Sequence, residues 1–245
     1  MRYALPFALT LLGASTLASA DTVGVFASVG RFGADVSGHI QSGADALDVN
    51  SDLGVSDEGQ RFFSVAFEHP LPLLPNVKLA RTDLDTSGTG VLNRSIAFDG
   101  QTFAAGSTVD TRLDLGHYDG ILYYEVLDNW VSLDLGLDLK YFDGEVRLRN
   151  SDVSSRTTLD DVIPAVYARA AFELPVTGIT LNLEGSGINY DGSELTDLKA
   201  GVMLESGPLV VEGGYRRFDL KLDDVADLTS DLKFDGAYLS VGLHL

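Results

Sequence analysis

A strict alternation of residue types over positions 131–141 constrains this chain more than any other feature. The odd positions carry Val131, Leu133, Leu135, Leu137, Leu139 and Tyr141, and the even ones carry Ser132, Asp134, Gly136, Asp138 and Lys140. A period of two places the two sets on opposite faces of a β-strand. The run has about 11 residues, enough for a tilted strand to cross a bilayer, and Trp130 and Tyr141 mark its ends, where interfacial aromatic rings are expected. The pattern predicts a transmembrane strand with one face toward lipid and one toward a polar interior.

The same alternation recurs along the chain and predicts further strands. It is clear over residues 166–173, 179–184, 197–204 and 239–245, where the apolar set would face lipid and the other set the lumen. Segments rich in β-branched and aromatic residues lie between loops of Gly, Asp, Ser and Asn. Together they predict ten strands, at about 22–36, 60–69, 77–88, 109–126, 130–148, 157–173, 179–190, 196–205, 208–221 and 231–245.

The connections between these strands indicate the architecture. Short links at 70–76, 127–129, 174–178 and 206–208 alternate with longer polar ones at 37–59, 89–108, 149–156, 191–195 and 222–230, of which 191–195 is compact. Such alternation is typical of outer-membrane barrels, with periplasmic turns and extracellular loops. We therefore expect an all-β fold, a closed antiparallel transmembrane β-barrel of about ten strands, with eight or twelve as alternatives. A soluble β-sandwich also alternates, but its strands need only five or six residues. Pro164 weakens the prediction of the 157–173 strand near its outer end.

The first 20 residues have the features of a cleaved signal peptide. Arg2 gives the positive start, residues 4–12 the apolar centre, and Ala18-Ser19-Ala20 a small-residue cleavage site before Asp21. Residues 21–245 would then form the barrel. Because position 21 is not cysteine, lipid attachment there is excluded.

Charge and cysteine content exclude several classes of function. The chain has 36 acidic and 17 basic residues, a formal charge of −19, and no cysteine. Disulfides, thiolate catalysis and cysteine metal sites are therefore excluded. Nucleic-acid binding is not expected, because no basic patch is available to replace phosphate counterions.

Several short stretches resemble a known group of proteins. They are Asp21-Thr22-Val23-Gly24-Val25, residues 67–76, residues 122–136, Tyr141-Phe142-Asp143-Gly144, Tyr190-Asp191-Gly192 and Phe234-Asp235-Gly236. With them, most of residues 21–245 resembles a poorly characterised family of outer-membrane β-barrel proteins of Gram-negative bacteria. The resemblance implies location and architecture and carries no catalytic residues. One departure is the last residue, since Leu245 stands where such barrels commonly end in Phe.

The inward faces of the predicted strands carry charges of both signs. The candidates for lining the lumen are Asp134, Asp138, Lys140, Arg169, Glu173, Glu184, Asp197, Lys199, Glu212 and Arg216. Neighbouring opposite charges favour an ion-paired lumen, and a ten-strand barrel is only slightly wider than the eight-strand kind that side chains fill. A large pore is not expected. A narrow conduit would prefer cations, because an acidic excess lowers their entry barrier.

Few residues suggest catalysis or metal binding. His117-Tyr118-Asp119 is an acid/base-capable cluster on a strand, but neither a Gly-x-Ser-x-Gly elbow nor a His-Glu-x-x-His helix occurs. His69 and His244 fall at a turn and at the C-terminus, and His39 lies in the first long loop. Two long loops are acidic, with Asp45, Asp48, Asp52, Asp57 and Glu58 in the first and Asp223, Asp224, Asp227 and Asp231 in the last. Neither matches a calcium-binding loop, so solvated carboxylates are the simpler interpretation.

We therefore expect an outer-membrane barrel without enzymatic activity, catalytic residues, metal or cofactor. Its predicted role is structural or that of a narrow conduit for small solutes, preferring cations. The alternatives are a surface recognition barrel whose acidic loops bind lipopolysaccharide through cations, and a hydrolase with a site at the barrel rim. The expected partners are outer-membrane lipid, lipopolysaccharide and the barrel assembly machinery, and the barrel itself is expected to be a monomer.

Overall fold

The computed structural model describes residues 23–71, 73–225 and 228–245. The signal peptide predicted for residues 1–20 lies outside the described residues. No helix long and apolar enough to cross a membrane occurs in the part of the chain that is described.

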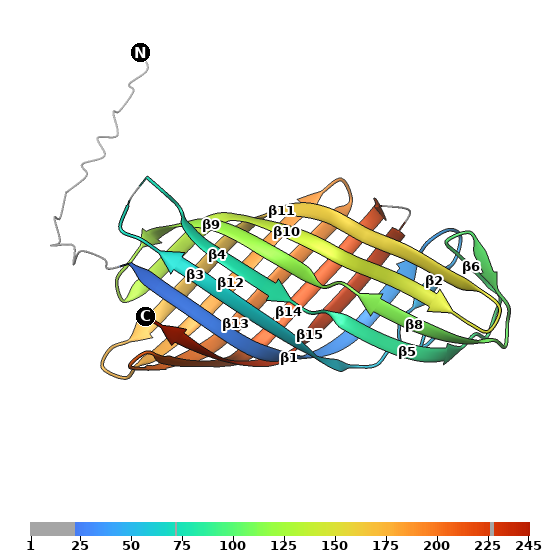
Figure 1. Ribbon diagram of the computed structural model, residues 1–245, viewed down its shortest axis with the longest axis horizontal. Helices are drawn as coiled ribbons and strands as arrows, with labels where there is room; N and C mark the ends of the chain where they lie inside the picture. The colour runs from blue at the N-terminus through green and yellow to red at the C-terminus, as the bar shows by residue number, and fades with distance from the viewer. Residues whose placement is uncertain (1–22, 72, 226–227) are drawn as a thin grey trace, which may run out of the picture.

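In the described part of the chain, ten strands form a closed antiparallel barrel (Figure 1). Their order around the wall is β11-β12-β13-β14-β15-β1-β3-β4-β9-β10, and pairing of β10 with β11 closes the ring. Their bounds are β1 (Gly24–Gln41), β3 (Glu58–Glu68), β4 (Asn76–Thr82), β9 (His117–Leu127), β10 (Val131–Arg149), β11 (Ser154–Leu174), β12 (Ile179–Tyr190), β13 (Ser193–Ser206), β14 (Leu209–Val225) and β15 (Leu228–His244). The prediction of a ten-strand antiparallel barrel is confirmed.

Five further strands lengthen the barrel at one end of the described structure, which we call the extension end. β5 (Asp85–Val91) follows β4, and β8 (Thr108–Asp114) precedes β9 and pairs with both β5 and β10. β2 (Ala46–Asp48) pairs with β1, and β6 (Ile96–Phe98) forms a hairpin with β7 (Gln101–Phe103). The opposite end, which we call the turn end, carries the short connections and the C-terminus (Figure 1).

The connections at the extension end are shorter than expected at two places. Among the described residues, 42–57 and 92–107 form the long connections there, the first with β2 and the second with β6 and β7. The links at 150–153 and 191–192 are tight turns, because β10 to β13 stay paired beyond the predicted strand ends. Residues that were predicted to lie in loops instead form backbone hydrogen bonds within the sheet.

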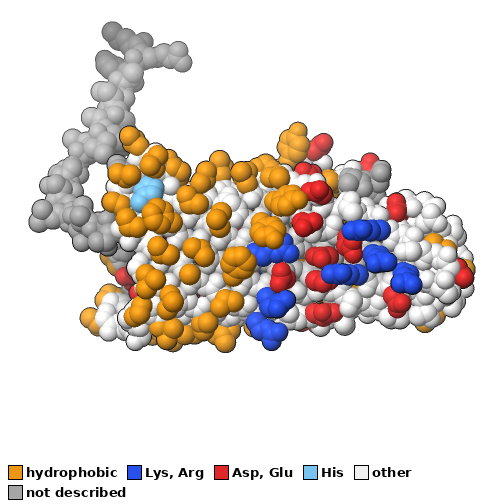
Figure 2. All heavy atoms as spheres, in the orientation of Figure 1, with side chains coloured by type: hydrophobic (Ala, Val, Ile, Leu, Met, Phe, Trp, Pro, Cys, Tyr) orange, Lys and Arg blue, Asp and Glu red, His pale blue; other side chains and the backbone are white. Residues whose placement is uncertain are grey.

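An apolar belt surrounds the half of the barrel nearer the turn end (Figure 2). Leu137, at the centre of the alternating run, is 61% exposed, whereas its neighbour Asp138 is 1% exposed. Trp130 and Tyr141 are both exposed, as expected of rings that border a bilayer. The other exposed residues of the belt include Val29, Phe63, Leu79, Leu122, Leu183, Leu198, Tyr215, Leu239, Val241 and Leu243.

The apolar residues change faces part-way along the strands. In β10 the outward side chains are apolar up to Tyr141, while beyond it Asp143, Glu145 and Arg147 occupy the outward positions. The inward side chains change in the opposite sense, from Asp138 and Lys140 to Phe142, Val146 and Leu148. The same strand therefore has the polarity of a membrane protein in one half and of a soluble protein in the other.

The extension end consequently has an apolar core inside the sheet. Its fully buried side chains include Phe32, Ile40, Leu47, Phe98, Phe103, Leu113, Phe142, Leu148, Phe218 and Phe234. They come from the barrel strands and from both long connections. Burial of this much apolar surface holds the extension together without lipid.

The wall is incomplete on one side of the extension. Pairing of β11 with β12 stops at Val166↔Gly187, whereas β11 continues to Ser154 with β10 as its partner. Pro164 lies in this unpaired stretch of β11, where its missing N–H costs no bond to β12. Together with the exposed Asp160 and Asp161, it discourages another strand from pairing with this edge.

Candidate functional site in the barrel interior

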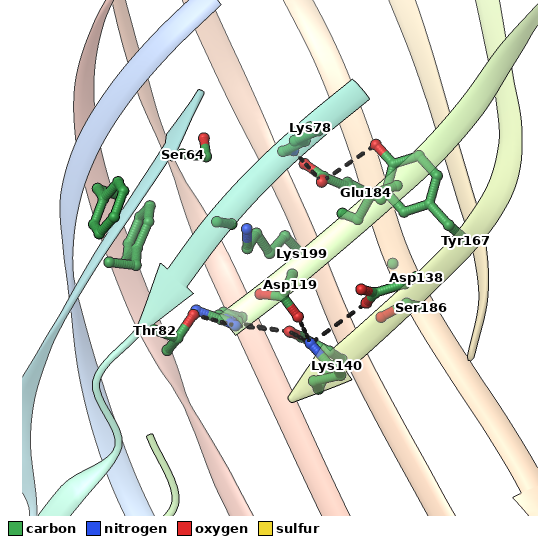
Figure 3. A pocket seen from close by; sticks show the side chains of 17 residues that line it. Ser64, Lys78, Thr82, Asp119, Asp138, Lys140, Tyr167, Glu184, Ser186 and Lys199 are labelled. Atoms are coloured by element: carbon green, nitrogen blue, oxygen red, sulfur yellow. Dashed lines mark hydrogen bonds and ion pairs between the residues drawn. The ribbon is translucent and has the colours of Figure 1, made fainter. Parts of the chain in front are cut away.

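A layer of charged side chains crosses the middle of the barrel (Figure 3). Lys140 pairs with Asp119 and lies 3.5 Å from carboxylate oxygens of Asp138 and Asp197. Arg216 donates to both oxygens of Asp197, from Nε at 2.9 Å and from Nη2 at 2.7 Å. A third hydrogen bond, at 3.2 Å, joins Arg216 to Thr82 on the far wall. These contacts tie β4, β9, β10, β13 and β14 together across the lumen.

The charged layer is electrically balanced. It contains four cations, Lys78, Lys140, Lys199 and Arg216, and four carboxylates, Asp119, Asp138, Glu184 and Asp197. Lys78 pairs with Glu184, which also accepts a hydrogen bond from Tyr167 at 3.3 Å. Buried charges cost several kcal/mol each unless paired, and equal numbers of opposite sign allow them to be packed here. The free space within the layer is about 30 Å³, which is room for one or two water molecules.

A larger polar cavity lies on the turn-end side of this layer. Its volume is about 230 Å³. Eight acidic side chains line it, Glu68, Glu125, Asp128, Asp134, Glu173, Glu184, Glu205 and Glu212, against Lys78, Arg169, Lys199 and His244. Three of the carboxylate contacts come from neutral donors: Tyr123 donates to Glu68, and Tyr238 and Asn182 donate to Glu212, at 2.8, 2.8 and 2.9 Å. We call this space the acidic cavity.

The structure places all ten candidate lumen residues against these two spaces. Asp138, Lys140, Asp197 and Arg216 line the charged layer, Asp134, Arg169, Glu173 and Glu212 line the acidic cavity, and Glu184 and Lys199 line both. Asp134 lies opposite Arg169 in the register of β10 and β11, and their ion pair measures 3.1 Å.

Sequence reasoning missed several members of the interior. Lys78 and Thr82 face inward from β4, and Tyr123, Tyr167 and Tyr238 supply hydroxyl groups. The alternation of β4 could have identified Lys78, because Leu79 and Arg81 face outward and residues at the positions between them face inward. Tyr167 belongs to the set that the alternation over 166–173 places on the lumen side, although it was not among the candidates. For Tyr123 and Tyr238 no such signal existed, since these amphipathic rings fit either face.

His117 has an apolar environment. Its ring lies 5.2 Å from the ring of Phe142 and stacks at 5.2 Å on that of Phe218. Nδ1 contacts the Leu115 carbonyl oxygen at 3.0 Å, and Nε2 has no hydrogen-bond partner among the described residues. Asp119 is engaged by Lys140. The cluster His117-Tyr118-Asp119 thus lacks the mutual hydrogen bonds of an acid/base site, and Tyr118 points outward.

The carboxylates of the first acidic loop bind the loop backbone. Asp48 Oδ1 accepts hydrogen bonds from the N–H groups of Asn50 and Ser51 at 3.1 and 2.7 Å, which lowers the pKa of Asp48. Asp57 accepts from Val36 N–H, and Asp45 from Ala97 N–H. No group of three or more His, Asp or Glu side chains in the described part of the chain is arranged to hold a metal ion. Asp227 of the last loop lies outside that part.

Searches for related proteins give structural similarities of low degree. No family model matches the sequence, and no curated protein matches it. Ail of Yersinia pestis, solved with the heparin analogue sucrose octasulfate, shares 10% identity over 91% of this chain and 99% of its own, with a TM-score of 0.33. The transport unit of the autotransporter AIDA-I from Escherichia coli shares 11% identity over 96% of this chain and 92% of its own, with a TM-score of 0.39.

A monoaromatic hydrocarbon channel, CymD, is similar to the same degree. It shares 9% identity over 91% of this chain and 88% of its own, with a TM-score of 0.33. Similarities this low say nothing about a ligand or an activity of the present chain. Its fold rests on the strand pairing described above, and its resemblance to a poorly characterised outer-membrane family stays a prediction.

Proposed function

We propose that this protein is an outer-membrane β-barrel with a closed lumen, which presents its extension at the cell surface as a recognition element. The observation that carries the proposal is the filling of the barrel interior. The charged layer has only about 30 Å³ of free space, and an apolar core with fully buried Phe142, Phe218 and Phe234 follows it toward the extension end.

The orientation follows from the two ends. Outer-membrane barrels have short periplasmic turns and longer extracellular segments. The turn end would therefore face the periplasm, with the acidic cavity opening on that side. The extension, with an outward face of charged residues such as Asp143, Arg147 and Arg156, would stand in the external medium.

A cation conduit is the second candidate, and the acidic cavity favours it. Eight carboxylates against three lysine or arginine side chains would concentrate cations there. Conduction would further require a continuous path to open through both the charged layer and the apolar core. The balance of charge in the layer and the bidentate contact of Arg216 with Asp197 oppose such an opening.

We also propose that the protein is not an enzyme. The support is the environment of His117, which packs between two phenylalanine rings and makes no hydrogen bond with Asp119, a side chain paired with Lys140. A rim hydrolase would need a base in contact with a nucleophile.

Planar-bilayer recording tests the closed lumen. The wild-type barrel, shown to be folded by heat-modifiable migration, is expected to give no stepwise current in potassium chloride. The matched variant carries Phe142→Ser, Phe218→Ser and Phe234→Ser, which wets the core beyond the charged layer and is expected to give noisy openings. Stepwise wild-type currents that scale with salt and prefer cations would refute the proposal in favour of a conduit.

A further inference from the structure

Three arginines on three adjacent strands lie at the border of the apolar belt that faces the extension end. On each of β1, β3 and β4, the outward position that follows the last exposed belt residue toward the extension end is an arginine. These are Arg31 after Val29, Arg61 after Phe63, and Arg81 after Leu79. One step of two residues corresponds to about 7 Å along a strand. Figure 2 shows basic side chains gathered where the apolar belt ends and the acidic surface begins.

The positive charge of this cluster is only partly neutralised. Arg31 and Arg61 lie directly opposite each other in the register of β1 and β3. Asp83 is shared, with an oxygen 3.5 Å from Arg61 and another 3.3 Å from Arg81. Arg31 makes no ion pair with any residue that the structure describes. Within the described part of the chain, Asp83 is the one carboxylate at ion-pair distance from these three arginines, so the cluster keeps a surplus of positive charge.

Such an arrangement is unfavourable in the protein alone. Like charges directly opposite each other on a sheet destabilise it. The other basic residues near this border are satisfied individually, since Arg217 lies 2.6 Å from Asp219 and Lys233 lies 3.0 Å from Asp235. Among the described residues at this border, the surplus is therefore confined to β1, β3 and β4, in a chain that carries a net charge of −19.

The position of the three arginines relative to the apolar belt indicates which group neutralises their charge. Residues that border the apolar belt lie at the level of lipid headgroups. Tyr118 and Tyr141, an exposed and stacked pair with centroids 6.5 Å apart, mark the same level on the neighbouring strands. The guanidinium of Arg81 lies 4.3 Å from the centre of the Tyr118 ring, which holds its position beside the belt.

We propose that Arg31, Arg61 and Arg81 bind a phosphate group of an anionic lipid headgroup in the outer leaflet. Guanidinium groups bind phosphate through paired hydrogen bonds, and their rigid fork matches its oxygens. The inference rests on the proposed function, because it requires the barrel to span a bilayer in the stated orientation. It places lipopolysaccharide contact on arginines at the belt, instead of on cations held by the acidic loops.

Titration with defined lipids tests the site. The folded full-length mature barrel in neutral detergent is titrated with diphosphoryl lipid A in mixed micelles at low salt, and binding is followed by calorimetry. Dephosphorylated lipid A and inorganic phosphate serve as the other ligands. Wild type is expected to bind diphosphoryl lipid A at least tenfold more tightly than either, and added salt should weaken binding.

Matched variants locate the binding. Arg31→Gln with Arg61→Gln is expected to weaken binding of diphosphoryl lipid A tenfold or more. Arg217→Gln, at the same border but paired with Asp219, is expected to leave it unchanged. The variant residues are exposed on the barrel surface, and heat-modifiable migration verifies that each variant is folded.

Each remaining outcome decides against the inference. Unchanged binding in the double variant, or equal binding of dephosphorylated lipid A, would refute the phosphate site. Equal affinity for inorganic phosphate would assign the site to free phosphate instead of lipid. If the barrel inserts into bilayers but does not bind, this inference alone fails. If it does not insert at all, the proposed function fails as well.

Discussion

Arg216 on β14 and Asp197 on β13 form a bidentate ion pair, and both side chains are buried inside the barrel. The pair does not lie in register, since Arg216 is opposite Lys199 and Asp197 is opposite Phe218. The guanidinium thus reaches diagonally past its own cross-strand neighbour and continues to Thr82 on β4. This diagonal contact joins opposite walls of the barrel at its middle.

Replacing Asp197 by Asn should strongly destabilise the barrel. The change leaves Arg216 buried without a compensating charge, which typically costs about 3–5 kcal/mol. Reversible urea unfolding in lipid vesicles measures the loss. Asp219→Asn, which breaks the more exposed pair with Arg217, is the control and should cost less than about 1 kcal/mol. Equal effects of the two changes would mean that the middle of the lumen is well hydrated.

Two leucines of β10 test the change of faces along one strand. Leu148 is fully buried in the extension core, whereas Leu137 is exposed in the belt. Leu148→Ala should cost about 2–5 kcal/mol, because it leaves a cavity in packed surroundings. Leu137→Ala removes only contacts with lipid or detergent and should cost about 1 kcal/mol or less. The melting temperatures of both variants in one detergent give the comparison, and a reversed order would contradict the assigned core.

Asp48 should make the first long connection sensitive to acid. Ser51 N–H, the largest influence, lowers the pKa of Asp48 in the folded loop. A carboxylate with a lowered folded-state pKa contributes stability above its unfolded value, near 4, and loses it as the pH falls through the folded value. Amide exchange of residues 49–55, corrected for intrinsic rates, should accelerate below about pH 4. Asp48→Asn should exchange faster at neutral pH and lose the pH dependence. Identical pH profiles for variant and wild type would disprove the role of Asp48.

The absence of cysteine allows the orientation to be tested on whole cells. Ser151→Cys lies in the exposed 150–153 turn at the extension end, and Thr177→Cys in the exposed 175–178 turn at the opposite end. A membrane-impermeant maleimide should label Cys at position 151 on intact cells and Cys at position 177 only after the outer membrane is opened. The reverse pattern would show that the barrel is inverted, and labelling of neither in lysed cells would place both turns inside folded structure.

The alternation over 131–141 was sufficient to predict which side chains face in and which face out. Period two is a local property of an extended chain, so it survives whatever the strand pairs with. The same holds for residues 166–173, 179–184 and 197–204, whose outward and inward sets agree with the observed burial. Strand number followed, because turn-forming residues separate the alternating runs.

The sequence was less informative where the apolar side chains of a strand change from its outward face to its inward face. Beyond Tyr141 the strand continues with its apolar side chains on the other face, a change that resembles the end of a transmembrane strand. The loops at 150–153 and 191–192 were predicted too long because β11 and β13 begin at Ser154 and Ser193, before the predicted starts at 157 and 196. The apolar core of the extension draws on strands and connections far apart in the chain, and no local pattern announces it.

By itself the sequence determined the period, the faces and the ten strands of this protein, because each depends on neighbouring residues alone. Only the tertiary structure decided which charges meet. Lys78 with Glu184, Arg216 with Thr82, and Arg31 opposite Arg61 come from strands whose register is set by closure of the barrel. Strand tilt and stagger fix that register for the whole ring at once, so the balanced layer inside and the surplus of positive charge outside arise only when the ring closes.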